Sequence, residues 1–312
     1  MQKLILAGLI LASIGGNAYA QSDELAQALQ NVRTNCGGIS AALDKMKTMA
    51  GINTAVTGVG TVSAGVALGT GIAKSKTDEE YDELLNKYIL DSVANETGDM
   101  TGDMQLTLAT TGITTANLSE ADKKDISDEL DRLLEKSKKL GNIRTGTLAA
   151  ATATSIAGAA IAGTNTIDDD FAAKIDSCAA SVKALANVKM IATVDGSADA
   201  TQTAQADKII SACGQYETLD LSSINKRATG AAVSSGIGAG LGLAGTITSA
   251  VANTDKTRAG NQQKEKNLNT AANVLAGGTA AASLTSTIFN ATQIAAIKRA
   301  ATVADECEEA LK

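Results

Sequence analysis

The sequence contains no histidine, no proline and no tryptophan, and only 2 % of its residues are aromatic. Without histidine there can be no histidine-based catalytic triad and no zinc site of the usual hydrolase kind. Carboxylate pairs such as Glu79 and Glu83 are more typical of solvated helix faces than of acid–base catalysis. We therefore expect no catalytic residue, no cofactor and no metal site, and a protein that is not an enzyme.

The composition of the chain also favours helices. Proline is the commonest helix breaker, whereas alanine, which is abundant here, favours helix. Because few large rings are available to fill a core, Ala, Leu, Ile and Val on closely approaching backbones must fill it instead. Alternating β-branched and aromatic runs, which are typical of strands, are nearly absent. The predicted fold class is all-α, with long helices.

The net charge of the chain is −7. This sign opposes attraction to phosphate groups and to an anionic membrane surface, so nucleic acid is not expected as a partner.

The amino-terminal segment has the features of a secretory signal peptide. Lys3 precedes an uncharged run from Leu4 to Ile14, and Ala18-Tyr19-Ala20 matches the small-x-small pattern that signal peptidase recognises. Position 21 is glutamine, which excludes lipoprotein processing at that site. We predict that residues 1–20 are cleaved and that the protein is exported.

Four long uncharged stretches dominate the rest of the chain. Each is at least as long as the roughly 20 residues that a helix needs to cross a bilayer. Glycine recurs every seven residues in the first stretch, at Gly51, Gly58 and Gly65, and small residues including Gly238 and Gly242 recur every four in the third. These helices are similar to the glycine zippers of membrane proteins, a packing motif that implies no activity. The four stretches are 50–73, 145–167, 228–254 and 267–297.

The four cysteines frame these stretches and indicate an internal duplication. In an exported chain four cysteines imply two disulfides, for which three connectivities are possible. The duplication favours Cys36 with Cys178 and Cys213 with Cys307. Each bridge would clamp the open end of one helical hairpin. The predicted organisation is a first hairpin unit at 21–185 with an acidic helical insert at 74–144, a linker at 186–204, and a second hairpin unit at 205–312.

Local patterns predict where helices begin and end. Apolar residues from Leu25 to Ala50 alternate at spacings of four and three, which is typical of a coiled-coil-like stripe, with a bend possible at Gly37-Gly38. Ser119 and Asp122 predict a helix start and Gly141 a helix stop. Asp168 to Asp170 indicate a helix boundary rather than a cation site. We also expect a loop around Thr97–Met104 and a turn at Asp195-Gly196-Ser197.

The uncharged stretches leave two locations open. Uncharged runs of this length are unusual in a soluble bundle, whose helices show a charged face to water. The leading hypothesis is a non-enzymatic envelope protein in a bacterial-type inner membrane, with its cysteine side in the periplasm, membrane lipid as partner and possible self-association. The stretch 145–167, however, contains few strongly apolar residues, which favours two alternatives. One is a soluble periplasmic or secreted bundle that binds a partner or host surface, and the other is a pore-forming hairpin protein. The sequence identifies no particular protein partner.

Overall fold

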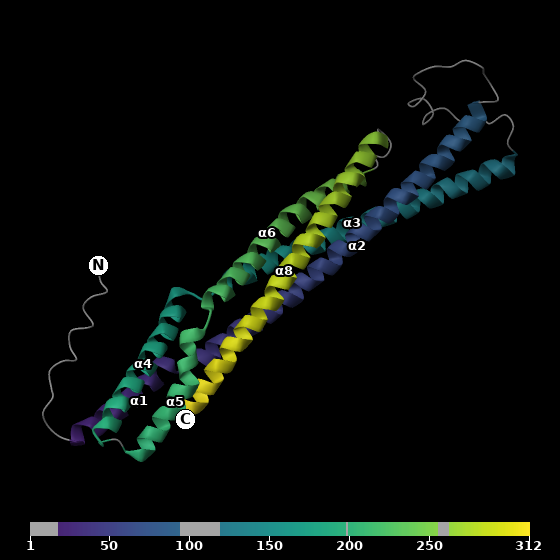
Figure 1. Ribbon diagram of the computed structural model, residues 1–312. Helices are drawn as coiled ribbons and strands as arrows, with labels where there is room; N and C mark the ends of the chain where they lie inside the picture. The colour runs from purple at the N-terminus through teal and green to yellow at the C-terminus, as the bar shows by residue number, and fades with distance from the viewer. Residues whose placement is uncertain (1–17, 94–118, 198, 255–261) are drawn as a thin grey trace, which may run out of the picture. The chain divides into compact units, whose positions relative to one another are not determined.

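The structure is a computed structural model that describes residues 18–93, 119–197, 199–254 and 262–312 (Figure 1). All regular structure in these ranges is helical, which confirms the predicted fold class. The predicted signal peptide, apart from Ala18 to Ala20, and the predicted loop around Thr97–Met104 lie outside the described residues. The helices are α1 (Ala18–Cys36), α2 (Ile39–Val93), α3 (Glu120–Thr164), α4 (Asp169–Val194), α5 (Ala200–Cys213), the 3₁₀ helix η1 (Gly214–Thr218), α6 (Leu221–Ala252) and α8 (Gln262–Leu311).

The chain forms two compact units, and neither is continuous in sequence. The cysteine unit consists of the described residues of Met1–Asn53, Ile161–Gly230 and Ile288–Lys312. The apolar-faced unit consists of those of Thr54–Ala160 and Ala231–Thr287. Each compact unit therefore combines parts of both hairpin units predicted from the sequence, and the duplication itself stays a prediction.

The break between α1 and α2 lies at the predicted glycine pair. Gly38 has φ +77°, a backbone conformation that residues with a side chain rarely adopt. The break leaves backbone N–H groups at the start of α2 without partners inside the helix. Glu308 of α8 supplies one, because its Oε1 accepts from the N–H groups of Gly38 at 3.0 Å and Ser40 at 3.3 Å.

Aspartates begin the next helices. The side chain of Asp168 accepts from the N–H of Phe171 at 2.7 Å, and Asp199 accepts in the same way from Gln202 at 3.3 Å. The Asp168–Asp170 segment is thus a helix boundary, as predicted. The predicted linker at 186–204 differs from the structure, because α4 continues to Val194 and the turn occupies only 195–197, around Gly196 with φ +66°.

The described parts of the acidic insert belong to two long helices. Residues 74–93 continue α2, and residues 120–144 form the first part of α3. The hydroxyl of Ser119 accepts from the N–H of Asp122 at 3.1 Å, which confirms the predicted helix start. Gly141, however, does not stop the helix. It lies inside α3, where a Cβ atom would come within 2.1 Å of the Asn253 side chain, so α3 and α6 approach each other closely at this position.

The cysteine unit is built around the predicted apolar stripe. Leu25, Val32, Ile39 and Leu43 are fully buried, and Met46 packs at the edge of the same core. Each such aliphatic side chain contributes on the order of 2 kcal/mol when it leaves water. Other large core residues come from α4, α5, α6 and the end of α8, among them Ile175, Leu185, Ile209, Ile224 and Ile297.

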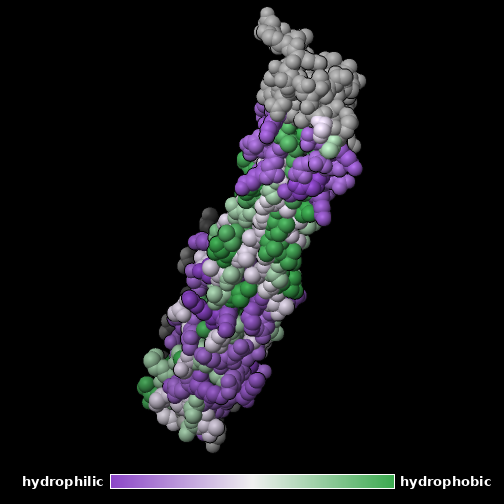
Figure 2. All heavy atoms as spheres, turned by 90° about the vertical axis from the view of Figure 1, so that its right-hand side faces the viewer, coloured by the Kyte–Doolittle hydropathy of each residue, from purple (hydrophilic) through white to green (hydrophobic). Residues whose placement is uncertain are grey.

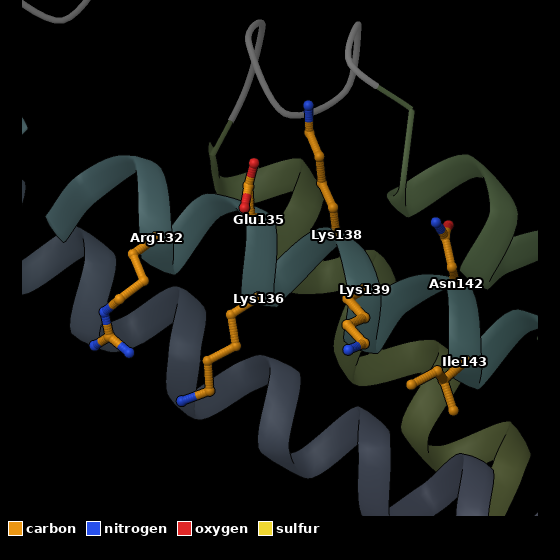
Figure 3. Close-up of a pocket in the computed structure, with 7 residues that line it drawn as sticks. All are labelled: Arg132, Glu135, Lys136, Lys138, Lys139, Asn142 and Ile143. Atoms are coloured by element: carbon orange, nitrogen blue, oxygen red, sulfur yellow. The ribbon is translucent and has the colours of Figure 1, made fainter. Parts of the chain in front are cut away.

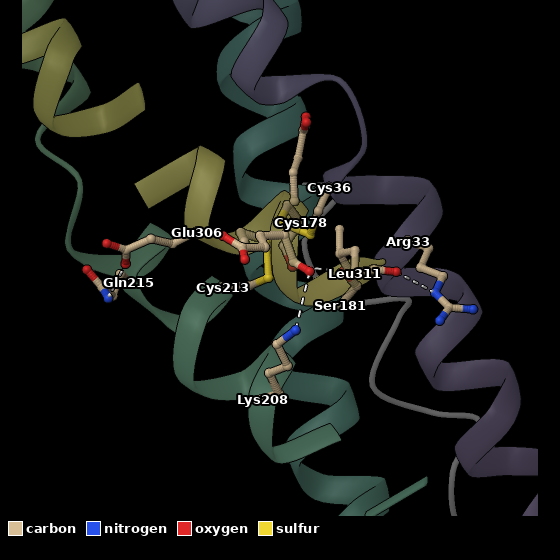
Figure 4. The surroundings of a disulfide bond; sticks show 12 residues. Arg33, Cys36, Cys178, Ser181, Lys208, Cys213, Gln215, Glu306 and Leu311 are labelled. Carbon is tan, nitrogen blue, oxygen red and sulfur yellow. Dashed lines mark hydrogen bonds between the residues drawn. A yellow bond between two sulfur atoms is a disulfide. The ribbon is translucent and has the colours of Figure 1, made fainter. Parts of the chain in front are cut away.

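Two disulfides connect the helices of this unit. Cys36 pairs with Cys178, joining α1 to α4, and Cys213 pairs with Cys307, joining α5 to α8. This is the connectivity that the sequence predicts. Figure 4 shows the end of α8 held beside the bridges by two basic side chains, since Arg33 donates to the carbonyl of Leu311 at 3.1 Å and Lys208 to that of Glu309 at 3.4 Å.

The apolar-faced unit is an antiparallel bundle of α2, α3, α6 and α8. On α2, Thr57 hydrogen-bonds to Thr287 and Lys74 to Glu265, so α2 and α8 run in opposite directions. The neighbouring pairs α2–α3, α3–α6 and α6–α8 also run in opposite directions and approach each other closely. They involve Gly60 with Thr154, Gly242 with Thr152, Gly141 with Asn253, Gly245 with Leu275, and Gly278 with Leu241. Each helix thus packs against two antiparallel neighbours.

Candidate functional site

Small polar side chains line the interior of the apolar-faced unit. The hydroxyls of Ser235 and Ser286 are 2.7 Å apart, and those of Ser155 and Ser283 are 3.4 Å apart. Other buried residues in this interior are Thr57, Thr152, Ser249 and Thr279, accompanied mainly by alanine. Among the described residues of this unit, the only buried apolar side chains larger than alanine are those of Leu133 and Leu148.

Large apolar side chains lie on the outside of the same bundle. Val62 is 68 % exposed, Val274 70 % and Ile237 54 %. Figure 2 shows such side chains gathered in a green band that is bordered by hydrophilic ones. A water-soluble core has the opposite arrangement, with branched apolar residues inside and Ser and Thr outside. The other members of this apolar surface are Val59, Val66, Ile72, Ile156, Val233, Leu243, Ile247, Val251 and Leu284.

Among the described residues three helical segments are long and apolar enough to cross a membrane. They are Glu24–Lys87, Lys124–Val194 and Leu221–Ala252. In their most apolar 18-residue stretches only 28–33 % of the residues are buried within the protein. These segments contain the first two predicted uncharged stretches and all but the last two residues of the third. The fourth, at 267–297 in α8, does not reach the same apolarity, because Asn, Thr and Gln interrupt it.

A network of charged side chains closes one end of the polar interior. The ammonium of Lys74 is fully buried and donates to Asp78 at 2.5 Å and to Glu265 at 2.9 Å. Ser137 of α3 also hydrogen-bonds to Asp78. The carboxylates remain partly exposed, at 20 % and 15 %. A buried ammonium is tolerated only when such partners replace its water.

Arg144 is the second fully buried cation of the network. Its guanidinium donates to Ser249 at 2.8 Å, to Asn269 at 2.8 Å and to Asn273 at 3.3 Å. The amide of Asn269 in turn donates to Asp78 at 3.2 Å, which links the two cations. All four helices contribute to the network, and its two cations and two carboxylates balance in charge.

Sequence analysis missed this network. Lys74 and Arg144 have the ordinary position of cations that flank an uncharged helix, and the sequence alone places such residues in water. The available signal was the pair Asn269 and Asn273, which are spaced by four residues at the start of the fourth uncharged stretch. That spacing puts both amides on one helix face, ready to accept from a buried donor.

The predicted packing glycines divide into two groups. At Gly242 a Cβ atom would lie 2.5 Å from the hydroxyl of Thr152, and at Gly238 it would lie 3.2 Å from that of Ser155, so α6 approaches α3 closely at both positions. At Gly51, Gly58 and Gly65 a Cβ atom would meet nothing within 4 Å. The predicted helix contact through these three is absent within the described chain.

Two other glycines of α2 lie where its helix contacts occur. A Cβ atom at Gly60 would lie 2.6 Å from Thr154, and one at Gly71 would lie 1.9 Å from Asn273. Their spacing of eleven residues is close to three full helical turns, which keeps both on one face. The seven-residue series that the sequence suggested lies on a different face.

The cysteines form one compact cluster in the cysteine unit. The sulfurs of Cys36, Cys178 and Cys307 lie within 4.8 Å of one another, and all three residues are buried. In disulfides these sulfurs are not thiolates, the form in which cysteine binds a metal. Their arrangement therefore indicates a structural clamp.

Comparisons with protein-family models, with curated proteins and with solved structures find no match to this chain.

Proposed function

We propose that this chain is a non-enzymatic structural or interaction protein of the cell envelope, embedded in a membrane through the apolar-faced unit. The observation that carries the proposal is the inverted polarity of that unit, with Ser, Thr, Asn and paired charges inside and Val, Ile and Leu outside. Exposed apolar surface of this extent is typical of an interface with lipid or protein.

The dimensions of the apolar surface agree with a bilayer. On α6 the exposed branched residues extend from Val233 to Val251. The 18 helical steps between these two residues correspond to roughly 27 Å of helix, close to the ~30 Å thickness of a hydrocarbon core. Hydroxyl pairs and close glycine contacts are the means by which helices associate where no hydrophobic effect acts between them.

The buried network also fits this environment. Ionisable groups within membrane helices face the bundle interior and pair with one another, as Lys74 does with Asp78 and Glu265. We propose that the cysteine unit lies on the oxidising, periplasmic side, where disulfides persist. The ends of the uncharged stretches nearest the α2–α3 and α6–α8 connections then lie on the cytoplasmic side, where basic residues such as Lys76, Lys139 and Lys264 flank them.

Cell fractionation tests the proposal directly. We expect the protein in the membrane pellet after an alkaline carbonate wash, with release only by detergent. Release by carbonate alone, followed by monodisperse behaviour without detergent, would instead support a soluble secreted bundle that binds a partner or host surface.

Three lysine substitutions distinguish a membrane-embedded protein from a soluble secreted one more sharply. Val62→Lys and Ile237→Lys place a charge on the apolar surface, and Val194→Lys is the matched control, at an 81 % exposed position at the end of α4 in the cysteine unit. A charge at the bilayer centre costs about 2.5–3.5 kcal/mol on the insertion scale. We therefore expect the first two variants to lose membrane recovery and the control to keep it. Equal recovery of all three would contradict membrane embedding.

A second candidate function is pore formation, which the polar interior favours. If the bundle opened in a target bilayer, its Ser, Thr and Asn side chains would face water while the apolar surface kept contact with lipid. Leakage of dye from liposomes on addition of the purified chain would support this function over a static structural role.

A further inference from the structure

The surface of α3 next to its uncharged stretch carries an open pocket of about 720 Å³ (Figure 3). All of its lining residues are exposed and come from α3 in the apolar-faced unit. They are Arg132, Glu135, Lys136, Lys138, Lys139, Asn142 and Ile143. We infer that this pocket, called the basic pocket below, binds the phosphate of an anionic phospholipid headgroup. The inference rests on the proposed membrane location.

The charge of the basic pocket is opposite to that of the whole chain. Four lining residues are basic and one is acidic, whereas the net charge of the protein is −7. Arg132 is already engaged, because its guanidinium donates twice to Glu129, at 2.7 and 2.5 Å. Lys136 and Lys139 are therefore the cations best placed to bind an added anion.

Cationic and apolar groups follow one another along a single side of the helix. Arg132, Lys136, Lys139 and Ile143 are spaced by four, three and four residues, and Figure 3 shows their side chains leaving α3 on the same side. Ile143 is 39 % exposed, and no charged residue other than the buried Arg144 follows until Asp168. A headgroup at Lys136 and Lys139 thus has an apolar surface for its acyl chains about 6 Å further along the helix.

This arrangement fits a lipid better than free phosphate. Small phosphates are usually held by free backbone N–H groups at helix starts or in glycine-rich loops. The basic pocket lies in the middle of α3, where those groups are used within the helix, so it offers side-chain donors alone, chiefly flexible ammonium groups. Such groups bind weakly on their own and gain strength when the anion belongs to a surface that the neighbouring apolar residues also contact.

A lipid titration of the purified full-length chain in a non-ionic detergent tests the inference. Native mass spectrometry would measure binding of phosphatidylglycerol and, separately, of phosphatidylcholine. The test variant is Lys136→Gln with Lys139→Gln. The matched control is Lys87→Gln with Lys124→Gln, two exposed lysines outside the pocket that carry the same total charge.

We expect the wild type to prefer phosphatidylglycerol and the test variant to bind it about 30-fold more weakly, while the control variant binds like the wild type. Unchanged binding by the test variant, or an equal loss in the control, would overturn the inference. Displacement of the lipid by millimolar inorganic phosphate would also overturn it, since the pocket would then be a site for a soluble anion.

The titration is independent of cell fractionation. A chain that stays in the membrane pellet but whose test variant binds phosphatidylglycerol normally would leave the proposed function intact and refute the basic pocket. A carbonate-soluble chain would refute the proposed function, and the titration would still decide whether the pocket binds lipid.

Discussion

Tyr216 is a buried residue whose hydroxyl finds no hydrogen-bond partner among the described residues. Burial raises the pKa of this phenol above its ordinary value, and the carboxylates of Glu308 and Asp305 add to the effect. The raised pKa means that the folded protein keeps the neutral form at a pH where the unfolded chain already ionises. The free energy of unfolding should therefore fall as pH rises above about 10.

We predict that Tyr216→Phe leaves the free energy of unfolding at neutral pH unchanged or raises it by roughly 1 kcal/mol, because it removes an unsatisfied buried hydroxyl. The variant should also lose part of the alkaline decrease. Denaturant unfolding followed by circular dichroism, at neutral pH and above pH 10, measures both effects. An alkaline decrease equal to that of the wild type would show that another group causes it.

Replacing glycine by alanine should change the free energy of unfolding in opposite directions at two positions that look alike in the sequence. At Gly242 the added methyl would meet Thr152, including its Cα at 3.4 Å, whereas at Gly58 it would meet nothing within 4 Å. We expect Gly242→Ala to lower the free energy of unfolding by about 1–3 kcal/mol and Gly58→Ala to raise it by about 0.5–1 kcal/mol. Thermal unfolding in detergent would compare the two, and a loss of stability at Gly58 would indicate a contact beyond this chain.

At the scale of helices, the charged network is the feature that joins all four members of the apolar-faced unit. Lys74→Met would leave two carboxylates facing each other across α2 and α8 without their cation. We predict a loss of about 3 kcal/mol in the free energy of unfolding. Lys76→Met, an exposed neighbour on the same helix, should change it by no more than about 0.5 kcal/mol. Denaturant titration of both variants measures the difference, and equal effects would contradict a structural role for the network.

The sequence predicted those helix features that depend on neighbours along the chain. Each of these features depends on one residue and the three or four that follow it in the sequence. They are the break at Gly37-Gly38, the cap at Asp168 and the helix start at Ser119. The role of Gly141 was predicted wrongly, because its close neighbour in the structure, Asn253, is 112 positions away in the sequence. Much of the predicted linker at 186–204 is helical for a similar reason, since Val182 and Leu185 pack into the core and α4 continues beyond them to Val194.

At the scale of the whole molecule, the bridges should contribute similarly to stability. The chain separations of 142 and 94 residues differ little on a logarithmic scale, and the loop-closure argument gives roughly 5 kcal/mol for each. We predict comparable losses for Cys36→Ser with Cys178→Ser and for Cys213→Ser with Cys307→Ser, measured by thermal unfolding. Peptide mapping without reductant should find only these two pairs. A Cys36–Cys213 peptide would contradict the connectivity.

Connectivity was predictable because the cysteines occupy corresponding places in the two halves of the sequence. The division into compact units was not. The pattern along the chain separates an earlier half from a later one, whereas tertiary contacts join residues that are far apart in the sequence. As a result α2, α3, α6 and α8 each contribute one part to the cysteine unit and another to the apolar-faced unit. The basic pocket and the buried network likewise depend on which face of a helix is covered, and only tertiary contacts determine that.

The closeness of the sulfurs has a consequence for how the protein matures. The sulfur of Cys307 lies within 4.8 Å of those of both Cys36 and Cys178, so a chain that folds before it is oxidised brings a thiol of one bridge close to both thiols of the other. Wrongly joined cysteines could then be corrected by thiol–disulfide exchange inside the folded protein, without unfolding. Newly made protein should accordingly reach a single bonding pattern even when oxidation begins late, with transient mixed pairings visible only if the reaction is trapped early by alkylation.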